Sequence, residues 1–185
     1  MADQLYLSYW LRGFSEHNML RHFERMLRLF PRSRLGPGAL LRVRAVEFAE
    51  PVLLERRFAG NEGTEEIIAA AAEFRHADMA CEVETAWDIW RYEGEWRLAP
   101  SAARLSCFGP LFESETGENL RVDFGADANF LPQAGVPDSL VMVRSNIRSL
   151  LHLVHTLDDA LAVDRRQLWS ESGVNFAERL QSALG

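Results

Sequence analysis

Lysine is absent from this chain, and all 20 of its basic residues are arginine. The absence excludes Schiff-base chemistry on a lysine, a lysine general base and the phosphate-binding lysine of a P-loop. We attribute it to a general compositional bias toward arginine, and the exclusions hold whatever its origin.

A surplus of positive charge is also lacking, because the net charge of the chain is −7 at pH 7. A nucleic-acid backbone and an anionic lipid surface are both bound by clustered cations. In addition, the run 52–59 lacks the Arg/Lys-Gly-aromatic signature of an RNA-recognition sheet. We therefore expect no nucleic acid and no membrane as a partner.

Long hydrophobic runs are missing as well. No stretch reaches the roughly 18 to 20 apolar residues that span a membrane, and the start Met-Ala-Asp-Gln shows no basic region followed by an apolar run. We expect a cytoplasmic protein. Its 185 residues, 48% of them hydrophobic, suffice for one domain with a buried core. We assign residues 1–99 to that core and residues 100–185 to an elaboration of strands and helices.

Cysteine is scarce, and the standard catalytic motifs do not occur. Cys81 and Cys107 belong to no CxxC motif and lie in strand-like segments, which favours buried free thiols over a disulfide or a metal site. The sequence contains no G-x-S-x-G, G-x-G-x-x-G, P-loop or H-E-x-x-H motif. The mechanisms that these spacings encode are therefore not indicated, and the sequence leaves the question of a cofactor open.

Hydrophobic periodicity predicts the order of the elements. Apolar residues alternate in strands and recur every three to four residues in helices. In the first half, this gives strand, helix, strand, strand, helix, strand, with strands at 5–12, 39–50, 52–59 and 79–92. The second half adds strands at 96–99, 102–112 and 119–124, a long helix from 138 to about 163, and a helix over 174–184. The predicted fold class is α+β, a ferredoxin-like (βαββαβ) core with additional antiparallel strands and C-terminal helices.

Four aromatic residues are predicted to share one open face of the sheet. Every second residue of a strand faces the same way, so the acidic face of the run 79–92 ends in Trp90 and Tyr92. Tyr6 and Trp10 of the first strand lie on the corresponding face. Such aromatic side chains bind flat ligands or another subunit. The alternative is that the C-terminal half or a dimer partner buries them.

A second candidate site lies on the long helix. His152, His155 and Asp159 share one helix face, and two histidines with a carboxylate form a partial ligand set for a divalent metal. No further residue is an obvious completing ligand. We therefore favour the alternative, a solvated or interface face of the helix.

The sequence favours a cytoplasmic binding or interaction module that uses its aromatic sheet face for a protein partner or a small ligand. We also expect it to self-associate as a homo-oligomer. The alternative is a small-molecule enzyme of the dimeric α/β-barrel kind, which resembles this core at the fold level and holds ligands between sheet and helices. An enzyme should show a concave pocket with convergent polar groups and titrating groups of shifted pKa.

Overall fold

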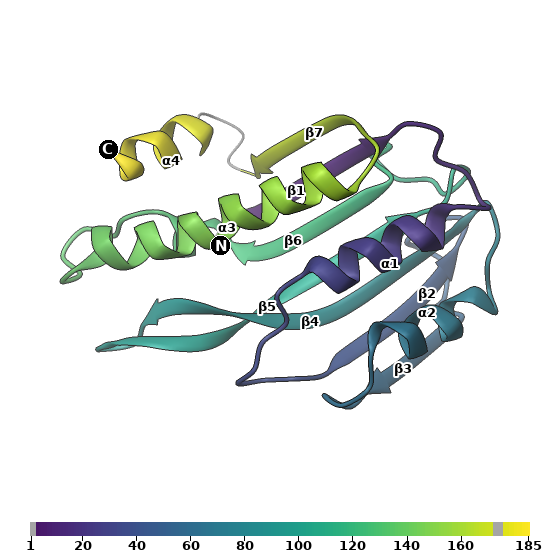
Figure 1. Cartoon of the computed structure of the whole chain (residues 1–185), viewed down its shortest axis with the longest axis horizontal. Helices are drawn as coiled ribbons and strands as arrows, with labels where there is room; N and C mark the ends of the chain where they lie inside the picture. The colour runs from purple at the N-terminus through teal and green to yellow at the C-terminus, as the bar shows by residue number, and fades with distance from the viewer. Residues whose placement is uncertain (1–2, 172–175) are drawn as a thin grey trace.

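The structure is a computed structural model that describes residues 3–171 and 176–185 (Figure 1). Within these ranges, seven strands form one antiparallel sheet in the order β3-β2-β4-β5-β6-β1-β7. The strands are β1 Gln4–Leu11, β2 Ala39–Ala45, β3 Leu54–Phe58, β4 Met79–Tyr92, β5 Trp96–Phe108, β6 Leu120–Ala126 and β7 Val163–Ser170. The helices are α1 Met19–Leu29, α2 Thr64–Ala72, α3 Ser139–Ala160 and α4 Phe176–Leu184, with a 3-10 helix η1 at Asp127–Phe130. The α+β class is confirmed.

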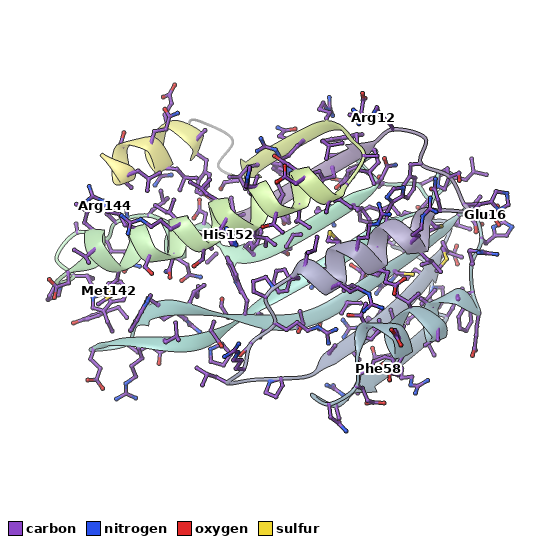
Figure 2. All side chains as sticks on the ribbon, in the orientation of Figure 1. Arg12, Glu16, Phe58, Met142, Arg144 and His152 are labelled. Carbon is purple, nitrogen blue, oxygen red and sulfur yellow. The ribbon has the colours of Figure 1, made fainter. Side chains whose placement is uncertain are left out.

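Helices α1, α2 and α3 all lie over the same face of the sheet (Figure 1). Their apolar stripes pack on the inward-facing residues of the strands, such as Leu7 in β1, Val83 in β4 and Leu105 in β5, which are fully buried. Side chains fill the space between the two layers (Figure 2). On the opposite side of the sheet, no helix of the described residues packs, and we call this side the uncovered face.

A ferredoxin-like core is not confirmed. The element order β1-α1-β2-β3-α2-β4 agrees with the prediction, and β2 alone separates β3 from β4, as a split βαβ unit requires. However, three strands separate β1 from β2, because β5 occupies the edge of β4 along thirteen paired residues and β6 follows it. Strand β1 instead pairs with β6 and β7, so the sheet is larger than the predicted core.

Several predicted boundaries change in the structure. The predicted strand 39–50 ends at Ala45, and the predicted strands 96–99 and 102–112 form the single strand β5. Strand β7 had no counterpart in the prediction. The predicted start of the last helix at residue 174 lies outside the described residues, and α4 begins at Phe176.

The β4–β5 hairpin extends beyond the sheet as a two-stranded arm. Pairing of β2 with β4 ends at Glu84, whereas β4 and β5 stay paired to Tyr92 and Trp96. Asn146 of α3 closes the free edge of the arm, because its Oδ1 accepts the Trp90 N–H and its Nδ2 donates to the Trp90 carbonyl, both at 2.8 Å. At the tip, Gly94 adopts a positive φ of 87°, as the predicted turn requires.

The two cysteines are free and buried, as predicted, and they lie directly opposite each other on β4 and β5. Burial raises the pKa of the Cys81 and Cys107 thiols well above their ordinary value. Because the thiolate is the reactive form, the folded chain should not react with Ellman's reagent at about pH 8. Both thiols should react after denaturation. The control is Ser149→Cys on the exposed side of α3, which should react while the chain is folded; rapid labelling of the parent chain would contradict the prediction.

Candidate functional site

One register row crosses the uncovered face from edge to edge. The pairing of consecutive strands aligns one residue from each strand on this face, in the order Arg57, Leu40, Glu84, Arg104, Asp123, Tyr6 and Trp169. We call this set the central row. Charges of opposite sign alternate over β4, β5 and β6, and the row ends in two aromatic residues on β1 and β7.

Ion pairs link the row to neighbouring residues of the same face. Arg42 Nη1 lies 2.6 Å from Glu84 Oε1, and Arg42 Nε lies 2.8 Å from Glu55 Oε2. Arg44 Nη1 lies 2.5 Å from Glu82 Oε2. Hydrogen bonds to Glu55 and Glu84 raise the pKa of Arg42, which keeps this guanidinium charged. The centre of the sheet therefore carries a network of ion-paired arginine and glutamate side chains.

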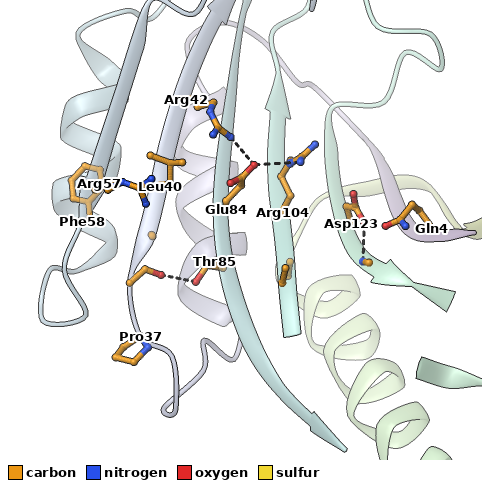
Figure 3. Close-up of a pocket in the computed structure, with 15 residues that line it drawn as sticks. Gln4, Pro37, Leu40, Arg42, Arg57, Phe58, Glu84, Thr85, Arg104 and Asp123 are labelled. Carbon is orange, nitrogen blue, oxygen red and sulfur yellow. Dashed lines mark hydrogen bonds and ion pairs between the residues drawn. The ribbon is translucent and has the colours of Figure 1, made fainter. Parts of the chain in front are cut away.

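Two hollows lie over this ion-pair network. The first, of about 670 Å³, is lined by the backbone and side chains around Arg57, Leu40, Glu84, Arg104 and Asp123, and we call it the Arg57 hollow (Figure 3). The second, of about 610 Å³, is bounded by the loops 47–49 and 113–116, and we call it the loop hollow. The two hollows share Arg42 and Arg104. They therefore adjoin and form one groove, which we call the central groove.

Aromatic packing holds the loops of the loop hollow in place. Phe108 and Phe112 form a small second core with Ala80 on the uncovered face. The more exposed Phe48 contacts both rings, with centroid distances of 5.8 and 5.1 Å. The Arg121 guanidinium lies 5.2 Å from the Phe108 ring and 5.5 Å from the Tyr6 ring. The wall of the groove on this side is thus built from packed rings and an arginine.

The four aromatic residues predicted for the open face fall into two separate pairs. Tyr6 and Trp10 lie on β1, whereas Trp90 and Tyr92 lie on the distal arm of β4, and no ring contact within the described ranges joins one pair to the other. Tyr6 instead packs on Trp169, with ring centroids 4.5 Å apart. Burial, followed by its hydrogen bond to Glu171, raises the pKa of Tyr6 to about 12, so the hydroxyl stays protonated at neutral pH.

The candidate metal ligands lie on the outer side of α3 (Figure 2 labels His152). His155 Nε2 lies 3.5 Å from Asp159 Oδ2, and both side chains are more than 70% exposed. Among the described residues, no three side chains of histidine, cysteine, aspartate or glutamate gather into a possible metal site. These positions form an exposed helix face in the structure, and their role as metal ligands stays a hypothesis.

The arginines of the central groove were not predicted as site residues. Their signal is the alternation in the run Leu-Leu-Arg-Val-Arg, which places Arg42 and Arg44 on one face of β2. The complementary alternation places Glu82 and Glu84 on one face of β4. Opposite charges with the same period suggest adjacent strands, because cross-strand pairs of opposite charge stabilise a sheet. Trp169 was missed because β7 itself was missed.

Comparison of the chain with protein-family models, curated proteins and solved structures finds no match. In the part of the chain that the structure describes, no helix is long and apolar enough to cross a membrane.

Proposed function

We propose that this protein is a binding module that holds a small ligand in the central groove. The observation that carries the proposal is the pair of adjoining hollows on the uncovered face. Their volumes, about 670 and about 610 Å³, lie in the range of roughly 300 to 1,000 Å³ that is typical of small-molecule sites. The size favours a small ligand over a protein partner.

The chemistry of the groove favours binding over proton transfer. Arginine is always charged at neutral pH and offers fixed donors, so it recognises a ligand without exchanging protons. The groups with raised pKa that can act as acids, namely Tyr6, Tyr9, Cys81 and Cys107, line neither hollow. The groove therefore has the polar groups expected of an enzyme pocket, but the acids of raised pKa named above do not line it.

The location of the groove also bears on the alternative function. An enzyme of the dimeric α/β-barrel kind would hold its ligand between the sheet and the helices. In this structure the described side chains fill that space with a continuous apolar core, and both hollows lie on the other side of the sheet. The uncovered face is therefore the better place for a ligand.

Native mass spectrometry of the purified full chain tests the proposal. We expect a small molecule that is retained under native conditions and released under denaturing conditions. Ala102→Trp places a large side chain in the Arg57 hollow, and it should weaken retention at least about tenfold, which corresponds to about 1.4 kcal/mol. The matched control is Leu98→Trp, on the same strand but in the exposed arm and outside both hollows.

The same measurement reports the number of subunits. A chain that forms a defined oligomer and carries no ligand would contradict the small-ligand proposal and favour a second copy as the partner of the uncovered face. Equal retention by Ala102→Trp and Leu98→Trp would show that the ligand binds elsewhere. The homo-oligomer stays a prediction that this experiment checks.

A further inference from the structure

Among the three arginines that pair with Glu82 and Glu84 on β4, Arg104 has the longest ion-pair distances. Its Nη2 lies 3.3 Å from Glu84 Oε1 and its Nη1 lies 3.9 Å from Glu82 Oε1. Both carboxylates have a closer guanidinium, because Arg42 reaches Glu84 at 2.6 Å and Arg44 reaches Glu82 at 2.5 Å. Arg104 therefore occupies the weakest position in this set of ion pairs.

The donors of Arg104 are also incompletely used. Within the described part of the chain, its Nε atom is buried and has no hydrogen-bond acceptor. The side chain as a whole is 43% exposed, and it lies where the two hollows meet. A guanidinium carries five N–H donors. The two Nη groups of Arg104 hold only long ion pairs, so they remain available to a ligand in the groove.

Arg57 is a second available cation in the same hollow. It lies at the opposite side of the Arg57 hollow, on the edge strand β3 (Figure 3). Its side chain forms no ion pair or hydrogen bond with any residue that the structure describes, although its backbone belongs to the β2–β3 ladder. Three arginines and two carboxylates line this hollow, namely Arg42, Arg57, Arg104, Glu84 and Asp123, which leaves one formal positive charge.

Most of the remaining lining residues are apolar, and Gln4 and Thr85 are the polar ones. Pro37, Leu40 and Ala102 contribute apolar side chains to the wall of the Arg57 hollow. We infer that the Arg57 hollow binds a small organic carboxylate, whose charged group pairs with Arg104 or Arg57 and whose apolar body lies against Leu40 and Ala102. One excess positive charge matches a carboxylate, whereas a phosphate monoester carries about −1.5 to −2 charges at neutral pH. This inference rests on the proposed function, because it names the ligand class of the same groove.

Three ligands of nearly the same shape test the inference: benzoate, benzamide and benzamidine, which carry negative, zero and positive charge. Isothermal titration calorimetry on the full chain should show saturable binding of benzoate and much weaker binding of the other two. The variant of the arginine that pairs with the carboxylate, Arg57→Gln or Arg104→Gln, should weaken benzoate binding about tenfold, since hydrogen bonds to charged groups are the stronger ones. A circular dichroism melt checks that each variant is folded.

The matched control is Arg91→Gln, which removes the same charge from the distal arm. Arg91 is 42% exposed, close to the 43% of Arg104, and it lies outside both hollows. Equal weakening by Arg91→Gln, or the absence of saturable benzoate binding, would overturn the inference. Binding of benzamidine in place of benzoate, lost in Ala102→Trp, would also overturn it but would leave the proposed binding module intact.

Discussion

Replacing Trp87 with alanine should lower the free energy of unfolding by about 3–5 kcal/mol, the usual cost of removing a large buried aromatic side chain. Trp87 is 1% exposed and is among the largest fully buried side chains of the described core. Its ring lies between three others, with centroid distances of 5.9 Å to Phe30, 5.1 Å to Phe124 and 5.9 Å to Phe130. It therefore joins the end of α1, strand β6 and η1 to β4. Urea denaturation followed by far-ultraviolet circular dichroism measures the effect.

Two further variants separate the packing of the ring from its polar atom. The Trp87 Nε1 atom is buried and has no acceptor among the described residues. Trp87→Phe keeps an aromatic ring and removes this unsatisfied donor, so it should cost much less than alanine. Trp96→Ala, on the half-buried arm, should also cost less. A loss at Trp87 no larger than the loss at Trp96 would show that Trp87 is not central to the core.

The local patterns of the sequence predict most of the helices and strands. The alternation of Val83, Trp87 and Ile89 with polar residues predicts β4 with the bounds that the structure shows. The spacing of Met19, Phe23 and Met26 predicts α1, and Pro31 explains its end. These elements follow from interactions within a short stretch of chain, and such interactions can be read directly from the sequence.

Strand β7 could not be found in this way. Its sequence Val-Asp-Arg-Arg-Gln-Leu-Trp-Ser has four consecutive exposed residues, because it lies at the edge of the sheet and has no buried apolar face there. Charged residues at a sheet edge discourage pairing with other chains. The feature that suits this segment to an edge also removes the hydrophobic alternation that identifies a strand.

The order of the strands and the central groove depend on pairing between distant segments. Arg57, Glu84 and Arg104 lie far apart in the sequence and become neighbours only through the register of β3, β2, β4 and β5. The acidic face of β4 was visible in the sequence, but its cationic partners were not assigned to the same face. A strand's period shows which residues share a face, whereas the identity of the neighbouring strand requires the whole sheet.

The ion pair between the buried Glu118 and the partly buried Arg121 is the second feature whose disruption should have a large effect. Arg121 Nη1 lies 3.1 Å from Glu118 Oε1, and the Glu118 side chain is 0% exposed. Thr116 also donates a hydrogen bond to this carboxylate. Removal of Arg121 leaves the Glu118 carboxylate as a buried charge without a compensating cation. Arg121→Met should therefore destabilise the protein by about 3–5 kcal/mol, measured by urea denaturation.

The loss of stability has two possible causes: the unpaired Glu118 carboxylate, and the lost packing of Arg121 against Tyr6 and Phe108. A double-mutant cycle distinguishes them. Adding Glu118→Gln to Arg121→Met removes the unpaired carboxylate charge, so the double variant should regain most of the lost stability. The control Arg91→Met breaks an ion pair of 3.5 Å in which both side chains are more than 40% exposed. It should cost less than about 1 kcal/mol, because exposed pairs contribute little. A double variant as unstable as Arg121→Met would instead assign the loss to the contacts of the guanidinium with the two rings. The loops over the loop hollow would then depend on that aromatic packing rather than on the ion pair.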